Sequence, residues 1–255
     1  MTTTIKNQMT MPSISETGHA KNVANFQDLI AFCQTYGTAY NPSKENLKMP
    51  QLQLLYQEAQ DQLTNFKTYK IAFDNATNSR QNTFADLRKL STRIINAFAV
   101  SGASALAVED AKSINRKIQG APPKKKTNPE NPTPPDSAGG TISNSQQSYD
   151  RLIDHFSTLI ILLKQYTEYA PNENELKITA LEAKLIELET SNTNLITAFA
   201  EYNVAMISRN NTLYNATNGL VQISREVKLY VKSVFGADSP QYAQVSNLEF
   251  KGRNN

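Results

Sequence analysis

The chain has 255 residues, of which 39% are hydrophobic, and carries a formal net charge of +3. This length allows one or two domains with a sizeable core, while 26 basic residues scattered among 23 acidic ones argue against a dedicated nucleic-acid binder. A single cysteine, Cys33, excludes an intramolecular disulfide and a multi-cysteine metal site, and its apolar neighbours predict a small buried hydrophobe.

The first 24 residues are polar, and we expect them to form a disordered tail. They contain no apolar run of the kind found in secretory signals, and no segment has the roughly 20 consecutive apolar residues that a membrane-spanning helix needs. A cytoplasmic location is therefore the expectation, with non-classical export left open.

A proline-rich stretch divides the chain into two similar halves. Residues 121–145 combine prolines with serines and lysines, which predicts a flexible linker. On either side the sequence repeats with an offset of 129 residues, most plainly in Tyr40 to Lys48 and Tyr169 to Lys177. The sequence therefore predicts two helical repeats, at 25–120 and 146–252.

Each repeat is expected to contain one long helix. In the second repeat an apolar position recurs in alternating steps of four and three from Leu181 to Val234, which is the heptad pattern of a coiled coil. The first repeat keeps this register less cleanly from Leu52 to Phe98, without proline or glycine in the stretch. We expect an uninterrupted helix of about 50 residues, about 75 Å long, in each repeat.

Shorter helices flank the predicted long ones. A helix at about 145–166 precedes the second long helix, Gly102 and Gly236 suit the left-handed position that ends many helices, and Ser239-Pro240 predicts the start of a short final helix. Because a heptad stripe has to be covered, the fold class is all-α. We expect an elongated bundle in which both repeats pack together with pseudo-two-fold symmetry.

Three motifs in the second repeat carry a resemblance to known proteins. They are Ser208 to Tyr214, Tyr230 to Gly236, and Ser239 to Tyr242. From about residue 25 onward the chain resembles a family of uncharacterised all-helical bacterial proteins with an internal duplication. The resemblance implies the helical architecture and brings no function with it.

No catalytic, cofactor or metal site is predicted. A di-metal helical bundle needs Glu-x-x-His pairs, and the one match, Glu16 to His19, falls in the predicted tail. His155 has no acidic residue three positions before it and is expected on the surface. Phosphate-binding glycine loops and nucleophile elbows do not occur in the sequence. We expect a protein that is not an enzyme.

The recurring positions of the heptad pattern form a stripe along each long helix, which we call the seam. Some seam positions carry polar residues. Arg80 and Arg209 occupy equivalent positions in the two repeats, and Asn192 and Lys70 stand at other seam positions. A buried guanidinium needs a partner, so these residues are interpreted first as a polar layer that fixes the helix register. Alternatives are that the arginines reach solvent where the seam opens, or that they bind an anion on the pseudo-two-fold axis.

Two surface features suggest partners. Lys124, Lys125 and Lys126 form the strongest basic cluster, interpreted as a solvated flank of the linker or as a weak contact to nucleic acid or an anionic membrane. The stretch from Ile94 to Val108 is the most apolar and is interpreted as a buried bundle end, or as a membrane-inserting tip.

A long heptad pattern combined with the lack of catalytic motifs predicts a structural or protein-interaction rod. Such a rod binds another protein or a second copy of itself. No small-molecule substrate is expected. The alternative hypothesis is a membrane-active protein similar to long-helix pore-forming toxins.

Overall fold

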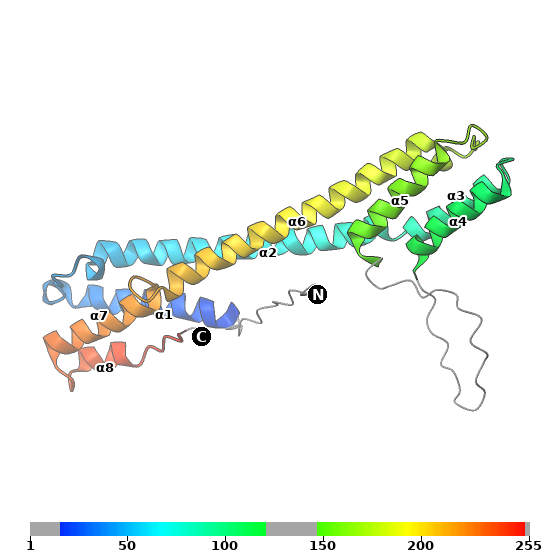
Figure 1. Ribbon diagram of the computed structural model, residues 1–255. Helices are drawn as coiled ribbons and strands as arrows, with labels where there is room; N and C mark the ends of the chain where they lie inside the picture. The colour runs from blue at the N-terminus through cyan, green and yellow to red at the C-terminus, as the bar shows by residue number, and fades with distance from the viewer. Residues whose placement is uncertain (1–15, 121–146, 253–255) are drawn as a thin grey trace, which may run out of the picture. The chain divides into compact units, whose positions relative to one another are not determined.

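A computed structural model describes residues 16–120 and 147–252, and within these ranges the chain forms helices and turns without a strand (Figure 1). This confirms the all-α class. The predicted linker at 121–145, with its lysine cluster, lies outside the described residues.

Eight α-helices follow one another along the described chain, with short 3₁₀ turns before the two longest ones. They are α1 (Glu16–Thr35), α2 (Met49–Phe84), α3 (Leu87–Ala99), α4 (Ala105–Gln119), α5 (Tyr149–Leu163), α6 (Ile178–Tyr214), α7 (Leu220–Phe235) and α8 (Pro240–Ser246). The 3₁₀ turns are η1 (Gly37–Ala39), η2 (Glu45–Leu47) and η4 (Asn174–Leu176).

The chain divides into two compact units. Of the described residues, 16–72 and 200–252 make up the first unit, and 73–120 and 147–199 make up the second. Because α2 and α6 each contribute residues to both units, the unit boundaries do not follow the predicted repeats. Each unit instead combines one end of the first repeat with the opposite end of the second.

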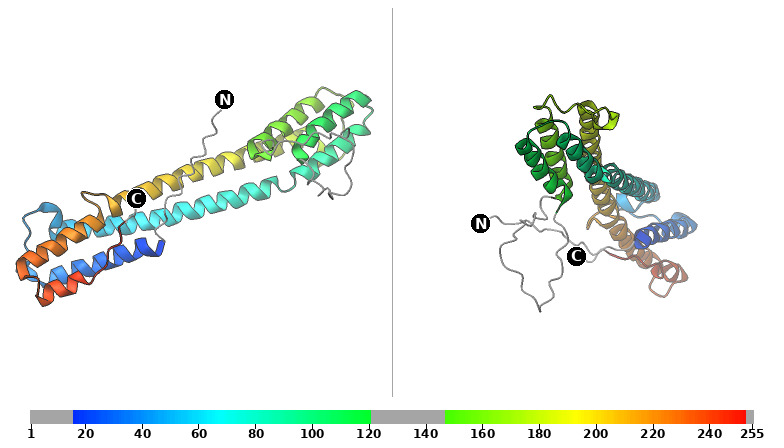
Figure 2. Two further views of the ribbon diagram at one scale, coloured as in Figure 1. Left: turned by 60° about the horizontal axis from the view of Figure 1, so that its bottom comes forward. Right: turned by 90° about the vertical axis from the view of Figure 1, so that its right-hand side faces the viewer.

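The first unit forms its core between α1, α7, α8 and the adjoining parts of α2 and α6. Leu220, Ile223, Val227 and Val231 on α7 are all buried, and their spacing of three and four residues puts them on one helix face. Helices α1 and α8 lie beside α7 (Figure 2). The predicted start of α8 is confirmed, since Ser239 Oγ accepts a hydrogen bond from the Tyr242 N–H at 3.1 Å and proline follows it.

The second unit places its core between α3, α4 and α5 and the adjoining part of α6. The apolar stretch from Ile94 to Val108 lies at this end. Ile94, Phe98 and Ala107 are buried in the core, whereas Val100 is 85% exposed. Leu106 is 80% exposed as well, so the two ends of the stretch are packed in the unit while its middle lies on the surface.

One buried tyrosine makes a hydrogen bond within the loop before each long helix. The Tyr40 hydroxyl donates to the backbone carbonyl of Leu47 at 2.8 Å, and the Tyr169 hydroxyl donates to that of Leu176 at 2.9 Å. Both tyrosines are 6% exposed. Residues that the sequence repeat matches thus make the same contact, one in each unit.

The predicted helix of about 50 residues is found in the first repeat, where α2 and α3 are separated only by the turn at Ala85 and Asp86 and together span residues 49–99. In the second repeat it is interrupted, since α6 has 37 residues and is separated from α7 by residues 215–219. Asn215 Oδ1 accepts the backbone N–H groups of Thr217 and Asn218 at 2.9 and 3.2 Å. These local bonds replace helical ones, which is why the heptad pattern misled the prediction.

The predicted tail also needs correction, because α1 begins at Glu16. His19, Asn22 and Val23 in this first part of α1 are buried. The polar side chains of His19 and Asn22 bond to Tyr214 and Lys251, which lie far away in the sequence, so the sequence pattern does not reveal their burial. Residues 1–15 lie outside the described part of the chain.

None of the helices within residues 16–120 and 147–252 combines the length and the hydropathy that a bilayer-spanning segment requires.

Candidate functional site

Arg209 is a buried charge at the centre of a polar cluster in the first unit. It is 4% exposed, and its Nη1 donates to Glu16 Oε1 at 2.7 Å. Its Nε and Nη2 both donate to Asn210 Oδ1, and the guanidinium lies 3.9 Å from the centre of the Phe66 ring. The guanidinium is thus paired and hydrogen-bonded, as a buried cation has to be.

Arg80 has related surroundings in the second unit, but it is only half-buried. Its Nη1 donates to Asn192 Oδ1 at 3.0 Å, and its guanidinium lies 3.8 Å from the centre of the Tyr149 ring. Asn192 in turn donates to Asp150 Oδ1 at 2.8 Å. The Nε atom of Arg80 is buried without a hydrogen-bond partner among the described residues.

The structure places the four predicted seam residues in different surroundings. Arg80 and Asn192 bond to each other, and Arg209 belongs to the other unit. Lys70 is exposed, so its assignment to a buried polar layer is wrong. A role of the arginines in fixing helix register stays a prediction.

Both histidines are buried, contrary to the sequence-based expectation. His155 is 6% exposed, and burial lowers its pKa below 6.5 despite the opposing effect of the neighbouring Asp154 carboxylate. His19 is 4% exposed on α1, with Nδ1 2.6 Å from the Tyr214 hydroxyl. Within residues 16–120 and 147–252, neither belongs to a group of three side chains suited to hold a metal ion.

Cys33 behaves as predicted. It is 1% exposed in the core of the first unit, and burial raises the pKa of its thiol to about 12. The thiol is therefore neutral at physiological pH and packs as a small hydrophobe.

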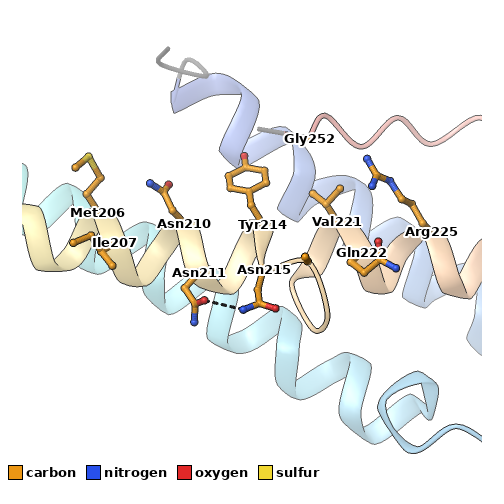
Figure 3. A pocket seen from close by; sticks show the side chains of 11 residues that line it. Met206, Ile207, Asn210, Asn211, Tyr214, Asn215, Val221, Gln222, Arg225 and Gly252 are labelled. Atoms are coloured by element: carbon orange, nitrogen blue, oxygen red, sulfur yellow. Dashed lines mark hydrogen bonds between the residues drawn. The ribbon is translucent and has the colours of Figure 1, made fainter. Parts of the chain in front are cut away.

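A pocket of about 550 Å³ lies where α6 ends and α7 begins (Figure 3). We call it the junction pocket. Five of its lining residues carry carboxamide or guanidinium groups: Asn210, Asn211, Asn215, Gln222 and Arg225. Among the described residues of this lining, Arg225 is the one that carries a charge. The volume of the pocket lies in the usual range of ligand sites.

The junction pocket escaped the sequence analysis because the heptad pattern was followed through it. The signal was nonetheless present, since the run Asn215-Ala-Thr-Asn-Gly219 has the composition of a turn. At the corresponding junction between α2 and α3 only two residues intervene. There Gln119 donates to the Arg88 carbonyl at 2.8 Å and to Ser91 Oγ at 3.0 Å.

Matching ion pairs hold the loop before each long helix. Lys44 Nζ lies 2.6 Å from Glu226 on α7, and Arg93 on α3 lies 2.7 Å from Glu175. The lysine lowers the pKa of the Glu226 carboxyl, and Arg93 lowers that of Glu175. All four groups are at least partly exposed, so solvent screens both pairs and each adds little to stability.

No known protein family, curated protein or solved structure matches the chain. The resemblance to the duplicated bacterial family therefore rests on its motifs.

Proposed function

We propose that this chain is a non-enzymatic structural or protein-interaction protein of the cytoplasm, which binds another protein or a second copy of itself. The observation that carries the proposal is the exposure of large apolar side chains on both long helices. More than half of the surface of each is exposed: Leu54, Ile71, Ile186, Ile196, Phe199, Val204 and Ile207.

Four of these residues form two short stripes on α6, one within each unit. Ile196 and Phe199 are one helical turn apart in the second unit, as are Val204 and Ile207 in the first. Isolated exposed apolar side chains are ordinary, but stripes of them usually mark a surface that another molecule covers. Because α6 carries Glu201 as its one charged residue between 190 and 208, charge repulsion opposes such a contact only weakly.

The side chains of the junction pocket support recognition over acid–base catalysis. Carboxamides do not titrate, and they both donate and accept hydrogen bonds. A lining of Asn210, Asn211 and Gln222 therefore suits the binding of polar groups without proton transfer.

We also infer that the chain is an internal duplication. The matched Tyr40 and Tyr169 contacts support this, as do the Lys44–Glu226 and Arg93–Glu175 pairs, which join equivalent loops and helices. A duplicated chain whose longest helix has one charged residue between 190 and 208 suits a scaffold better than a single-site enzyme.

Site-specific photo-crosslinking tests the proposed function. A benzophenone amino acid is introduced at Ile196 in one variant and at Val204 in another, with exposed Asn194 on a different face of α6 as the matched control. We expect both apolar positions to give an adduct with the same protein, identified by mass spectrometry, and Asn194 to give none. Equal adduct yields at all three positions, or no adduct at any, would contradict the proposal.

A further inference from the structure

The segment 248–252 lies against its own fold in the manner of a bound peptide. It has no helical structure, and the two backbone groups of Lys251 both bond to one side chain: Asn22 Nδ2 donates to its carbonyl at 2.9 Å, and its N–H donates to Asn22 Oδ1 at 3.0 Å. Asn25 Nδ2 donates to the Glu249 carbonyl at 2.7 Å. Carboxamides of α1 therefore bind the backbone of this docked segment independently of its side chains.

Burial along the docked segment alternates from residue to residue. Leu248 and Phe250 are half-buried against the core of the first unit, while Glu249 and Lys251 are exposed. Lys228 on α7 donates to the Leu248 carbonyl and lies 5.2 Å from the centre of the Phe250 ring. A period of two is that of an extended chain, in which alternate side chains point to opposite sides.

The docked segment leads directly to the junction pocket. Gly252, the last described residue, lines it. Figure 3 shows Gly252 close to Tyr214, with Asn210 and Met206 further along α6. The pocket therefore begins where the docked segment ends. Asn22 and Asn25 already bond to the extended backbone of that segment.

The pocket has unused hydrogen-bonding groups suited to the same chemistry. Asn210 and Asn211 accept hydrogen bonds through Oδ1 from Arg209 and Asn215, which leaves their Nδ2 groups without acceptors among the described residues. Gln222 donates through Nε2 to Glu226 and keeps its Oε1 as an acceptor. The lining therefore offers both donors and an acceptor to a peptide backbone.

Charge determines which peptide suits the pocket. Arg225 is exposed and makes no ion pair with a described residue, and no acidic residue is among the described residues that line the pocket. A carboxylate placed beside this guanidinium gains a charge-assisted hydrogen bond, whereas a lysine there is repelled.

We propose that the junction pocket binds an extended, acidic peptide segment of a partner protein. Its backbone bonds to Asn210, Asn211 and Gln222, and one of its carboxylates bonds to Arg225. This inference rests on the proposed function, because it assigns a site to the interaction. The pocket lies within the first unit, and near the corresponding turn of the second unit the Gln119 side chain bonds to Arg88 and Ser91 on α3. We therefore expect one peptide to bind per chain.

Selection from a peptide library by the full chain tests this site. The probe is a library of capped octapeptides, randomised at all positions, from which bound members are identified by mass spectrometry. A selected peptide is then labelled with fluorescein and titrated by fluorescence polarisation. We expect enrichment of Asp or Glu at a fixed position and saturation at one peptide per chain. An absence of acidic enrichment would overturn the proposal.

Variants connect the binding to the pocket. Arg225→Gln is expected to weaken binding at least tenfold, and Asn210→Ala together with Asn211→Ala at least fivefold. Two exposed residues away from the pocket serve as matched controls, Lys89→Gln for the charge and Asn194→Ala for the carboxamides, and they are expected to leave binding unchanged. Equal affinity of the Arg225 variant and the unaltered chain would refute the assignment.

Two further measurements distinguish a partner peptide from other possible occupants of the junction pocket. Competition by free glutamate as strong as that by the capped peptide would identify a small organic acid as the ligand and overturn the peptide proposal. A tenfold gain in peptide affinity on removing residues 253–255 would identify these residues as the occupant and overturn it as well. Loss of peptide binding with crosslinks retained at Ile196 and Val204 would remove this site and leave the proposed function standing.

Discussion

Replacement of Arg209 by alanine is the most direct test of how the first unit is held together. The guanidinium is 4% exposed, and it bonds to Glu16, bonds to Asn210 and lies over Phe66. Arg209→Ala removes these contacts and leaves a space in the core. Losses of this kind cost about 2 to 4 kcal/mol, so the free energy of unfolding falls by about that amount. A chain of this size would lose about 2 to 4 °C in Tm per kcal/mol.

Two companion variants set the scale of this effect. Glu16→Gln keeps a hydrogen-bond acceptor, and the Glu16 side chain is 53% exposed, so we expect a loss of about 1 kcal/mol or less. Arg80→Ala removes a half-buried group and should cost about 1 to 2 kcal/mol, less than Arg209→Ala.

Urea unfolding followed by far-ultraviolet circular dichroism measures all three variants under the same conditions. Tyrosine fluorescence gives a second probe, because the chain contains no tryptophan. If the two probes give different midpoints, the units unfold separately and each transition is analysed by itself. A loss below about 1 kcal/mol for Arg209→Ala, or a loss no larger than that of Arg80→Ala, would refute the reasoning from burial.

Three further predictions concern single buried groups. Tyr40→Phe and Tyr169→Phe each remove one hydroxyl that donates to a backbone carbonyl, so each should lower the free energy of unfolding by about 1 kcal/mol in urea titrations; a clear inequality would contradict the equivalence of the two loops. Because the His155 pKa is lowered in the fold, the unfolded chain binds more protons, and stability should fall as pH drops below about 6.5; His155→Gln should flatten this part of the profile. The Cys33 pKa is raised from 9.0 to about 12, so the stability that its neutral thiol contributes is complete below pH 9 and is lost as pH rises from 9 towards 12. Cys33→Ala should reduce that slope, to which Tyr40 and Tyr169 also contribute above pH 10 because burial raises their pKa values. Reaction of the native thiol with a disulfide reagent at pH 8 should be far slower than after unfolding.

Local sequence signals predicted those elements whose hydrogen bonds close within a few residues. Ser239 caps α8 through the N–H three residues further on, and Gly236 ends α7 with a φ of 89°, as the turn chemistry implied. The Tyr40 and Tyr169 loops make the same contact because the donor tyrosine and the acceptor leucine are seven positions apart in both.

Longer-range features were predicted wrongly where a tertiary contact outweighed a local pattern. The seam pattern placed Lys70 inside, but the side chain is exposed. It also continued through residues 215–219, where Asn215 bonds to the following N–H groups and ends the helix. The sequence placed His19 and Asn22 in a polar tail. In the fold, His19 hydrogen-bonds to the Tyr214 hydroxyl and Asn22 donates to the Lys251 carbonyl.

By itself, the sequence determined that the described chain is helical and where α8 begins, because helix periodicity and capping are set by residues a few positions apart. Only the tertiary structure decided which groups meet across the chain. Burial of Arg209, capture of the segment 248–252 by Asn22 and the junction pocket beside Gly252 join residues up to 229 positions apart. No local pattern encodes such distances, since they follow from how the faces of separate helices pack.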